Sequence, residues 1–253
     1  RPQRAPLAAG SAPVVARIPP RVSGVEAIIA GGRTEATPVV SASSDSAPQL
    51  ATGSSPIRIA RGTIAIGPYM VAAIPAGRRA PDDLFAPRHL PELGKVVEQV
   101  LAAEAPMTID LLARRVGAYF GIGRVTQRVT DQVRAALLGR GRLGDEQNVV
   151  WRMDQDPAGV PAVRVAGSGP AARRDIGEVP LAELAAAARI VVERSAGAAG
   201  SIGAAELVRD AARLLGFARI TDVVTDRIAL GVQLAHQRSL IEIDPTGKAR
   251  LPS

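Results

Sequence analysis

The sequence contains no cysteine, and aromatic residues make up only 2% of its 253 residues. Without cysteine there is no disulfide framework and no thiolate metal site, which suits a reducing compartment, and we expect the chain to be cytoplasmic. No run of about 18 apolar residues occurs, so the sequence predicts no membrane-spanning helix. Residue 1 is Arg and no signal-peptide pattern follows it, which favours a chain that is part of a longer polypeptide.

Recognisable catalytic motifs are also missing. The Gly247-Lys248 pair lacks the upstream glycine and the following hydroxyl residue that a phosphate-binding loop requires. The sequence also shows no cluster of carboxylates with a basic partner, the pattern that would indicate a metal-dependent nuclease. The two histidines, His89 and His236, lie far apart beside arginines, and we interpret them as surface or helix-end residues. We therefore expect no catalytic residue, no metal and no cofactor, and we do not classify the chain as an enzyme.

An internal repeat is the strongest signal that is present. Residues 121–133 recur at 216–228 with a constant offset that keeps Gly, Arg, Thr, Val, Thr and Asp in place. Helical periodicity precedes each copy, and Gly121 and Gly216 stand where a helix ends, a position that favours a left-handed residue without a Cβ. Apolar residues then follow one stripe of a new helix in both copies. Each copy predicts a helix, a short turn and a second helix.

A further helix and a hairpin surround each copy. Pro91 and Pro180 each open an amphipathic helix ahead of the repeat. Residues 143–151 follow the first copy, and residues 239–251 follow the second with the alternation and the Pro-Thr-Gly turn of a β-hairpin. Three helices and a small hairpin form the pattern of a winged helix. We therefore expect a mainly α protein with small β-hairpins, built from two tandem winged-helix (helix-turn-helix) units.

Composition sets the boundaries of these units. Residues 1–62 are rich in Ala, Pro, Ser and Gly and contain no aromatic residue, which predicts a disordered N-terminal linker. Residues 63–152 are expected to hold a strand-like lead-in, packed on the first winged helix, and that winged helix itself. Residues 153–178 are interpreted as a second linker, with the alternative of a short strand at 162–165. Residues 179–253 are expected to hold the second winged helix.

The repeated charged residues and the single tryptophan have structural interpretations. Asp131 and Asp226 occupy the same place in the two copies, and we interpret them as charge partners that hold each unit together. Arg114 and Arg209, also repeated, are the candidate partners. Trp151 is interpreted as core filling at the end of the wing rather than as a stacking platform for bases.

Charge distinguishes the two copies. The net charge is +7, divided as +5 over residues 1–90, +2 over residues 91–152 and zero over residues 153–253. In the first copy, polar and basic residues nevertheless lie on or beside the presumed recognition helix and at the entry to the wing. These candidate nucleic-acid-binding residues are Arg124, Gln127, Arg128, Arg134, Arg140 and Arg142. The alternative is an ordinary solvated charged face.

Several motifs, taken in order, resemble a known family. They are Tyr69, Glu104 with Pro106, Arg114-Arg115-Val116, residues 121–133, Trp151, Arg164, residues 179–184 and residues 212–219. Over residues 64–243 they are similar to the C-terminal region of large bacterial superfamily I helicase-like proteins, a region classed as a domain of unknown function. In that family it follows an ATPase and often an endonuclease domain of the very-short-patch-repair type. Ala105 stands where the family prefers glycine.

Three classes of function follow from these features. The first is an accessory DNA-binding module whose first unit meets a duplex, beside helicase ATPase and nuclease domains of the same or a partner polypeptide, as the resemblance implies. The second is a protein-interaction or scaffold module that orients those domains. The neutral second copy suits it, because Asp222 and Asp226 would repel phosphate. A diverged catalytic domain ranks last. Fold alone does not choose among these classes.

Overall fold

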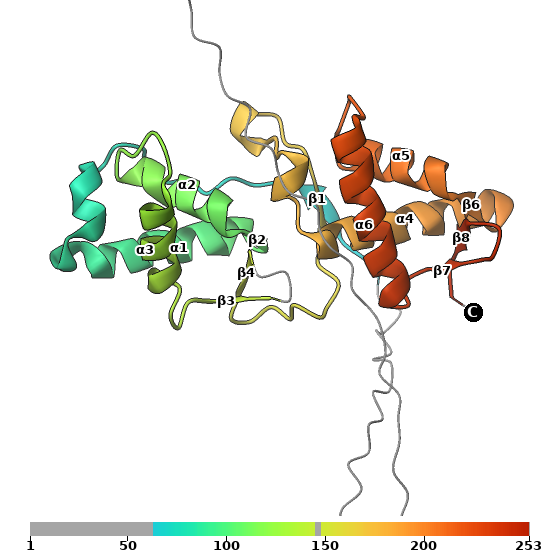
Figure 1. Ribbon diagram of the computed structural model, residues 1–253, viewed down its shortest axis with the longest axis horizontal. Coiled ribbons are helices and arrows are strands. Elements are labelled where there is room, and N and C mark those ends of the chain that lie inside the picture. Colours follow the sequence, from blue (N-terminus) through green and yellow to red (C-terminus); the bar gives the residue numbers. More distant parts are fainter. Residues whose placement is uncertain (1–62, 145–147, 253) are drawn as a thin grey trace, which may run out of the picture. The chain divides into compact units, whose positions relative to one another are not determined.

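The computed structural model of the protein describes residues 63–144 and 148–252, which contain six α-helices and three small sheets (Figure 1). This confirms the prediction of a mainly α protein with small β-hairpins. The predicted linker at 1–62 lies outside the described residues. Within the described part of the chain, no helix is both long enough and apolar enough to cross a membrane.

The first copy of the repeat contributes three helices and one antiparallel sheet, whose strand order is β2-β4-β3. Thr108 precedes the second helix and accepts a hydrogen bond from the N–H of Leu111 at its Oγ1, which satisfies one of the free donors of that helix. In chain order the elements are α1 (Leu90–Glu104), β2 (Met107–Thr108), α2 (Ile109–Tyr119), α3 (Gln127–Ala136), β3 (Gly141–Leu143) and β4 (Val149–Arg152).

The second copy repeats this order of elements. Its sheet has the strand order β6-β8-β7, so the strand before the second helix again pairs with the last strand of the hairpin. The elements are α4 (Leu181–Ala199), β6 (Ile202–Gly203), α5 (Ala204–Leu214), α6 (Asp222–Gln237), β7 (Glu242–Ile243) and β8 (Lys248–Arg250). The hairpin predicted for residues 239–251 is thereby confirmed.

The two glycines of the repeat end α2 and α5 as predicted. Gly121 has φ 66° and Gly216 has φ 92°, values that a residue with a Cβ rarely adopts. The N–H of Gly121 donates to the carbonyl of Ala118, and that of Gly216 donates to the carbonyl of Arg213. These contacts use carbonyl groups that the helix leaves free and turn the chain toward the next helix.

The repeat also extends further toward the N-terminus than its sequence signal indicates. The 3-10 turns η1 (Pro81–Phe85) and η4 (Ile176–Glu178) start at positions separated by the same offset as Gly121 and Gly216. A carbonyl in η1, and the carbonyl of the residue that ends η4, each accept a side-chain hydrogen bond from the third helix of the same repeat. Gln132 donates to the carbonyl of Leu84 (3.2 Å), and Arg227 donates to that of Val179 (3.4 Å). Each repeating unit therefore includes the turn before its first helix.

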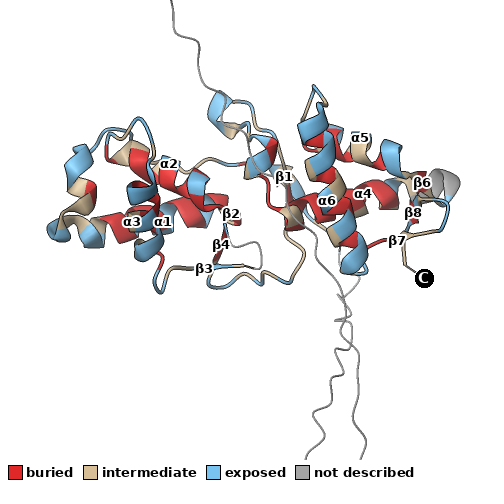
Figure 2. Cartoon of the chain, in the orientation of Figure 1, coloured by how far each residue is buried: buried red, intermediate tan, exposed pale blue. Residues whose placement is uncertain are grey.

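Buried residues line the inward faces of the helices in both repeats (Figure 2). The first core contains many large side chains, among them Leu93, Leu101, Met107, Leu112 and Phe120. The second core relies on small residues, including the run Ala185, Ala186, Ala187 and Ala188 of α4. Trp151 is 4% exposed and packs with Val149 and Ala182, which confirms its interpretation as core filling.

The lead-in joins the two repeats instead of packing on the first alone. Strand β1 (Ile66–Pro68) pairs in parallel with β5 (Val163–Val165), a strand that confirms the alternative given for residues 162–165. Ile64 packs against the second core, whereas Ile74 packs against the first. The lead-in therefore contacts the first core, where it was expected to pack, and also the second repeat, through a strand pairing between segments that are distant in sequence.

Candidate nucleic-acid interface

Helix α3 presents a polar face to solvent because its apolar residues are used by the first core. Val129 and Val133 are 4% and 0% exposed, and Thr130 between them is 6% exposed. Thr126 precedes the helix in an extended conformation, so the turn after Gly121 delivers the chain directly into α3. The residues on the opposite side of the helix therefore point away from the protein.

Four of the six predicted binding residues lie on or beside this face. Arg124, Gln127, Arg128 and Arg134 are all exposed. Gln127 donates from Nε2 to Oδ1 of Asp131 (2.8 Å), so an amide and a carboxylate occupy the middle of the face. Within residues 63–144 and 148–252, Arg124 and Arg134 make no hydrogen bond or ion pair through their side chains. Both guanidinium groups are thus available to an external anion.

One flank of α3 is covered by η1. The guanidinium of Arg128 lies 4.0 Å above the ring of Phe85, an arrangement in which the cation faces the negative surface of the ring. Gln132, four residues after Arg128 on α3, donates to the carbonyl of Leu84 and so holds η1 at a second point. Arg128 is therefore exposed but held in place, with its fork of N–H donors still open to solvent at the edge.

The two arginines predicted at the wing form contacts with other segments of the chain. Arg140 has its Nε 2.9 Å from a carboxylate oxygen of Glu98, and its Nη1 donates to the carbonyl of Leu138 (3.2 Å). Its guanidinium covers Gly94 of α1, where an added Cβ would lie 2.6 Å from Cζ. Arg142 donates to the carbonyl of Gln155. Both arginines thus fasten the hairpin region to neighbouring segments, and the structure does not bring them into the exposed face of α3.

The structure adds one arginine that the sequence did not indicate. Gly77 and Arg79 donate backbone hydrogen bonds to the carbonyls of Ala118 (2.7 Å) and Tyr119 (3.1 Å), so the lead-in runs along the C-terminal end of α2. Arg78 between them is exposed and makes no side-chain bond within the described part of the chain. It therefore lies at the turn that carries Arg124. No periodicity reveals this proximity, because the two segments are distant in sequence.

The predicted charge partners within each repeat do not pair. Arg114 forms its ion pair with Glu178 of η4 in place of Asp131, which bonds to Gln127. Among the described residues, no ion pair joins Arg209 to Asp226 either. The equal spacing of these residues in the two copies indicated correctly that they occupy equivalent positions. It did not show which oppositely charged side chain lies nearest to each of them.

The corresponding face of the second repeat has a different character. At the places of Gln127, Arg128 and Arg134 it carries Asp222, Val223 and Ala229. Arg219 is retained opposite Arg124. The third helices of the two repeats are thus equivalent in their buried residues and opposite in the charge of their exposed ones.

Part of the chain is similar to a known family. Residues 82–131 match the model of a family described as "Protein of unknown function (DUF3320)". The match begins in η1 and ends in the middle of α3, so it includes the turn at Gly121 and the first part of the candidate interface. It supports the expectation that the chain contains a domain of unknown function. No curated protein and no solved structure gives a significant match.

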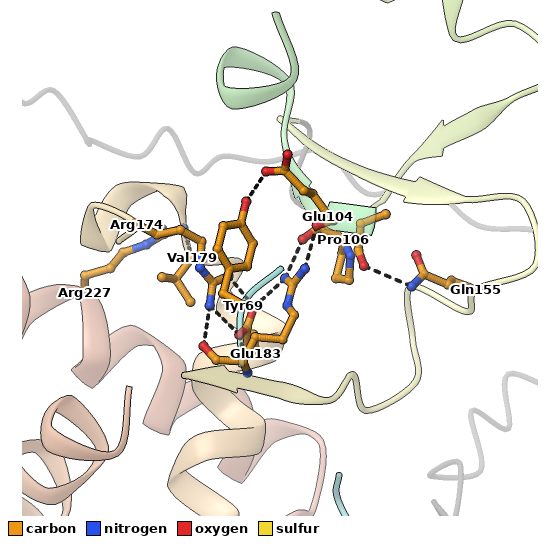
Figure 3. A network of polar contacts seen from close by, with 10 residues as sticks. Tyr69, Glu104, Pro106, Gln155, Arg174, Val179, Glu183 and Arg227 are labelled. Carbon is orange, nitrogen blue, oxygen red and sulfur yellow. Dashed lines mark hydrogen bonds and ion pairs between the residues drawn. The ribbon is translucent and has the colours of Figure 1, made fainter. Parts of the chain in front are cut away.

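Two buried carboxylates at the junction of the repeats form the most extensive polar network (Figure 3). Glu104 lies in the stretch that matches the family and is 0% exposed. It accepts hydrogen bonds from the hydroxyl of Tyr69, from the N–H of Ala72 (3.0 Å) and from Nε of Arg115 (3.1 Å). Burial, and then the bond to Glu104, raise the pKa of Tyr69.

The second carboxylate, Glu183, is also 0% exposed and lies between two arginines. Its oxygens are 2.6 Å from Nη2 of Arg164 and 2.7 Å from Nη2 of Arg174. Burial works to raise the pKa of Glu183, but the hydrogen bonds and charges of Arg174 and Arg164 outweigh it and lower that pKa. The carboxylate therefore stays ionised as the centre of a buried ion triad.

Arg164 connects the two carboxylates. Besides its pairing with Glu183, it donates to the backbone carbonyls of Glu104 (2.5 Å) and Pro106 (2.6 Å), at the end of α1. The residues that carried the family resemblance, Tyr69, Glu104, Arg115, Arg164 and Glu183, meet in this network. Sequence reasoning gave them no role, since their contacts join five segments (the lead-in, α1, α2, β5 and α4) that no local pattern connects.

Proposed function

We propose that the chain is a non-catalytic, accessory nucleic-acid-binding module made of two winged-helix units, of which the first contacts duplex DNA. The observation that carries this proposal is the asymmetry between α3 and α6. Their buried stripes repeat, yet Arg124, just before α3, and Arg128 and Arg134, on it, are exposed at positions where the second repeat keeps only Arg219. Selection on the fold alone does not require such a difference, because exposed residues contribute little to stability.

The order of elements supports the winged-helix part of the proposal. In each repeat a short strand separates the first and second helices and pairs with the hairpin that follows the third. In DNA-binding proteins with a helix-turn-helix, the second helix of that motif enters the major groove with its N-terminal residues on the base edges. Helix α3 is the equivalent element, and Gln127 and Arg128 occupy its first turn.

The side chains on this face suit the two kinds of contact that a duplex offers. Arg78 and Arg124 lie before the start of α3, where guanidinium groups and the positive end of the helix dipole favour a phosphate. Arg128 can reach a guanine edge with two hydrogen bonds, and Gln127 has the donor and acceptor pair that fits adenine. Arg134 is nearly two turns further along α3 and would neutralise a second phosphate.

A second candidate function is a scaffold that orients neighbouring domains. It is favoured by the exposed face of α6, where Val223 is 68% exposed and Leu230 is 46% exposed beside two aspartates. Apolar side chains rimmed by charges are typical of protein contacts and unsuited to phosphate. The resemblance suggests helicase ATPase and nuclease domains, in the cytoplasm, as the partners of such a scaffold.

The equivalent arginines Arg124 and Arg219 give a matched test of DNA binding. We expect Arg124→Ala in the full chain to weaken binding of a short duplex, and Arg219→Ala to leave it unchanged. Each lost phosphate contact should reduce the slope of log affinity against log salt by about 0.9. Fluorescence anisotropy over a salt series measures both quantities.

The triple variant Arg78→Ala/Arg124→Ala/Arg134→Ala should give the largest change in slope. If all variants bind like the wild-type chain, the α3 face is not the DNA-binding surface. The scaffold function is then the better conclusion.

A further inference from the structure

The exposed face of α6 lies beside an apolar groove in the second repeat. The groove has a volume of about 550 Å³ between α5 and the start of α6, and it is lined by Ala204, Ala205, Val208, Arg209, Ile220 and Thr225. Val223, Asp226 and Leu230 follow one stripe of α6 at helical spacing. Thr225, which lines the groove, directly precedes Asp226 on α6, so the second repeat presents exposed apolar side chains and carboxylates on the helix that borders the groove.

In the part of the chain that the structure describes, no cation is paired with the carboxylates of this surface. Asp222 and Asp226 are exposed, and neither forms an ion pair within residues 63–144 and 148–252. A partner for this surface should therefore combine apolar side chains with positive charges at the spacing of a helix.

The α3 face of the first repeat has that chemistry. Arg128 and Arg134 are exposed on it, Asp131 between them is bonded to Gln127, and Leu138, just beyond the C-terminal end of α3, is 85% exposed. Because both faces are open to solvent, the α3 and α6 faces of one chain do not cover each other. A second copy of the chain supplies the missing partner.

We propose that the α6 face of one chain binds the α3 face of a second copy, with Arg128 and Arg134 opposite Asp222 and Asp226. The contact uses different surfaces on the two partners, so it leaves one α3 face and one α6 face free at the ends of every assembly. It does not depend on DNA binding, although DNA on α3 would compete with it.

The expected association is weak. A contact made by one helix face and one groove buries less than the roughly 800 Å² per partner of a stable interface. The exposed ion pairs contribute little each and are screened by salt. Association should therefore appear at about 10 to 500 μM protein and low salt, the range of transient contacts.

Charge reversal on one face at a time tests the pairing. The α3 variant is Arg128→Asp/Arg134→Asp, and the α6 variant is Asp222→Arg/Asp226→Arg. Sedimentation velocity of the full chain, without DNA, should show concentration-dependent association of the wild-type chain. In either variant alone, the concentration needed for half-association should rise about tenfold or more.

Mixing the variants distinguishes this contact from others. In the mixture, the native α6 face of the α3 variant meets the native α3 face of the α6 variant, and the two reversed faces also have opposite charges, so association should return to the level of the wild-type chain. A chain that carries all four reversals should associate like the wild type. A wild-type chain that stays monomeric overturns the proposal, and so does an α3 variant that still associates normally. Circular dichroism of each variant verifies that it is folded.

Discussion

The two repeats share a turn and an order of elements, yet they pack their helices in different ways. In the first repeat, Leu93, Leu112 and Phe120 fill the space between helices with large side chains, all of them fully buried. In the second repeat, alanines line α4, and Gly231 of α6 lies so close to α4 that an added Cβ would overlap the Cβ of Leu184. The same order of helices can therefore pack with different distances between the helices, provided that side chains of the right size fill the volume between neighbouring helices.

The polar interior differs in the same way. Glu104, from the end of α1, is neutralised by one arginine and bonded to a tyrosine, whereas Glu183, near the start of α4, is held by two arginines. Both carboxylates lie at the junction of the repeats. Charged groups thus hold the junction, in which β1 pairs with β5, whereas packed apolar side chains hold each core.

Removal of Glu183 should have the largest effect on this comparison. In the Glu183→Ala variant, Arg164 and Arg174 lose their shared counter-ion while 12% and 5% exposed, respectively. Breaking a buried pair by removing one partner destabilises a protein by about 3–5 kcal/mol. Urea denaturation should show a loss of this size.

The matched control is Glu193→Ala, because Glu193 pairs with Arg189 one helical turn away on α4 and is 34% exposed. We expect this variant to lose less than about 1 kcal/mol. Equal losses in the two variants would show that the junction is not held by its buried charges.

The sequence predicted this fold as far as local pattern decides it. The six helices follow apolar periodicity, and the left-handed turns at Gly121 and Gly216 follow from the need for a residue without a Cβ. The strand at β5 was foreseen only as an alternative, and its pairing with β1 was not foreseen. A three-residue strand carries little periodicity, and its partner is chosen by tertiary contacts.

The candidate interface could likewise be predicted only where local sequence pattern decides it. The sequence pattern indicated that Arg128 and Arg134 lie on α3 and that Arg124 lies just before it, but it gave no information about partners of Arg140 and Arg142. Those partners, Glu98 and the carbonyl of Gln155, come from α1 and from the segment after β4. The role of Glu104 and Glu183 was likewise invisible, because a buried charge is recognised only with its counter-ion.

A change at Gly231 tests the close packing of the second repeat. Gly231→Ala places a methyl group against the Cβ of Leu184 and its backbone, so α4 and α6 must separate. Overpacking of this kind costs about 1–3 kcal/mol. Thermal unfolding should show a lowered midpoint.

The control for this change is Gly177→Ala in η4, an exposed position where an added Cβ meets no atom within 4 Å. That variant should stay within about 0.5 kcal/mol of the wild type. If Gly231→Ala is equally harmless, the two repeats do not differ in helix spacing as described.

The smallest expected effect concerns a polar cluster that only the first repeat has. Glu92 accepts hydrogen bonds from Tyr119 and Arg79 and lies 3.1 Å from Nδ1 of His89. The equivalent positions of Glu92 and Tyr119 in the second repeat are Ala187 and Leu214, which join the apolar core region instead. The bonds from Tyr119 and then Arg79 lower the pKa of Glu92 to about 2, against a smaller opposing effect of burial.

Because the pKa of Glu92 is lower in the folded chain than the ordinary value of 4.5, its contribution to stability is present above pH 4.5 and disappears as the pH falls toward 2. Glu92→Gln should therefore lose less than about 1 kcal/mol near neutral pH and show a flatter pH dependence in that window.

Tyr119→Phe removes one of the hydrogen bonds to Glu92 and should raise the pKa of Glu92. The pH range over which this carboxylate loses its contribution to stability should then end at a higher pH than in the wild-type chain. Urea midpoints between pH 7 and pH 2 measure both effects. A Glu92→Gln profile parallel to that of the wild type would assign the acid sensitivity to other carboxylates, such as Glu183 at the junction, whose pKa is also lowered.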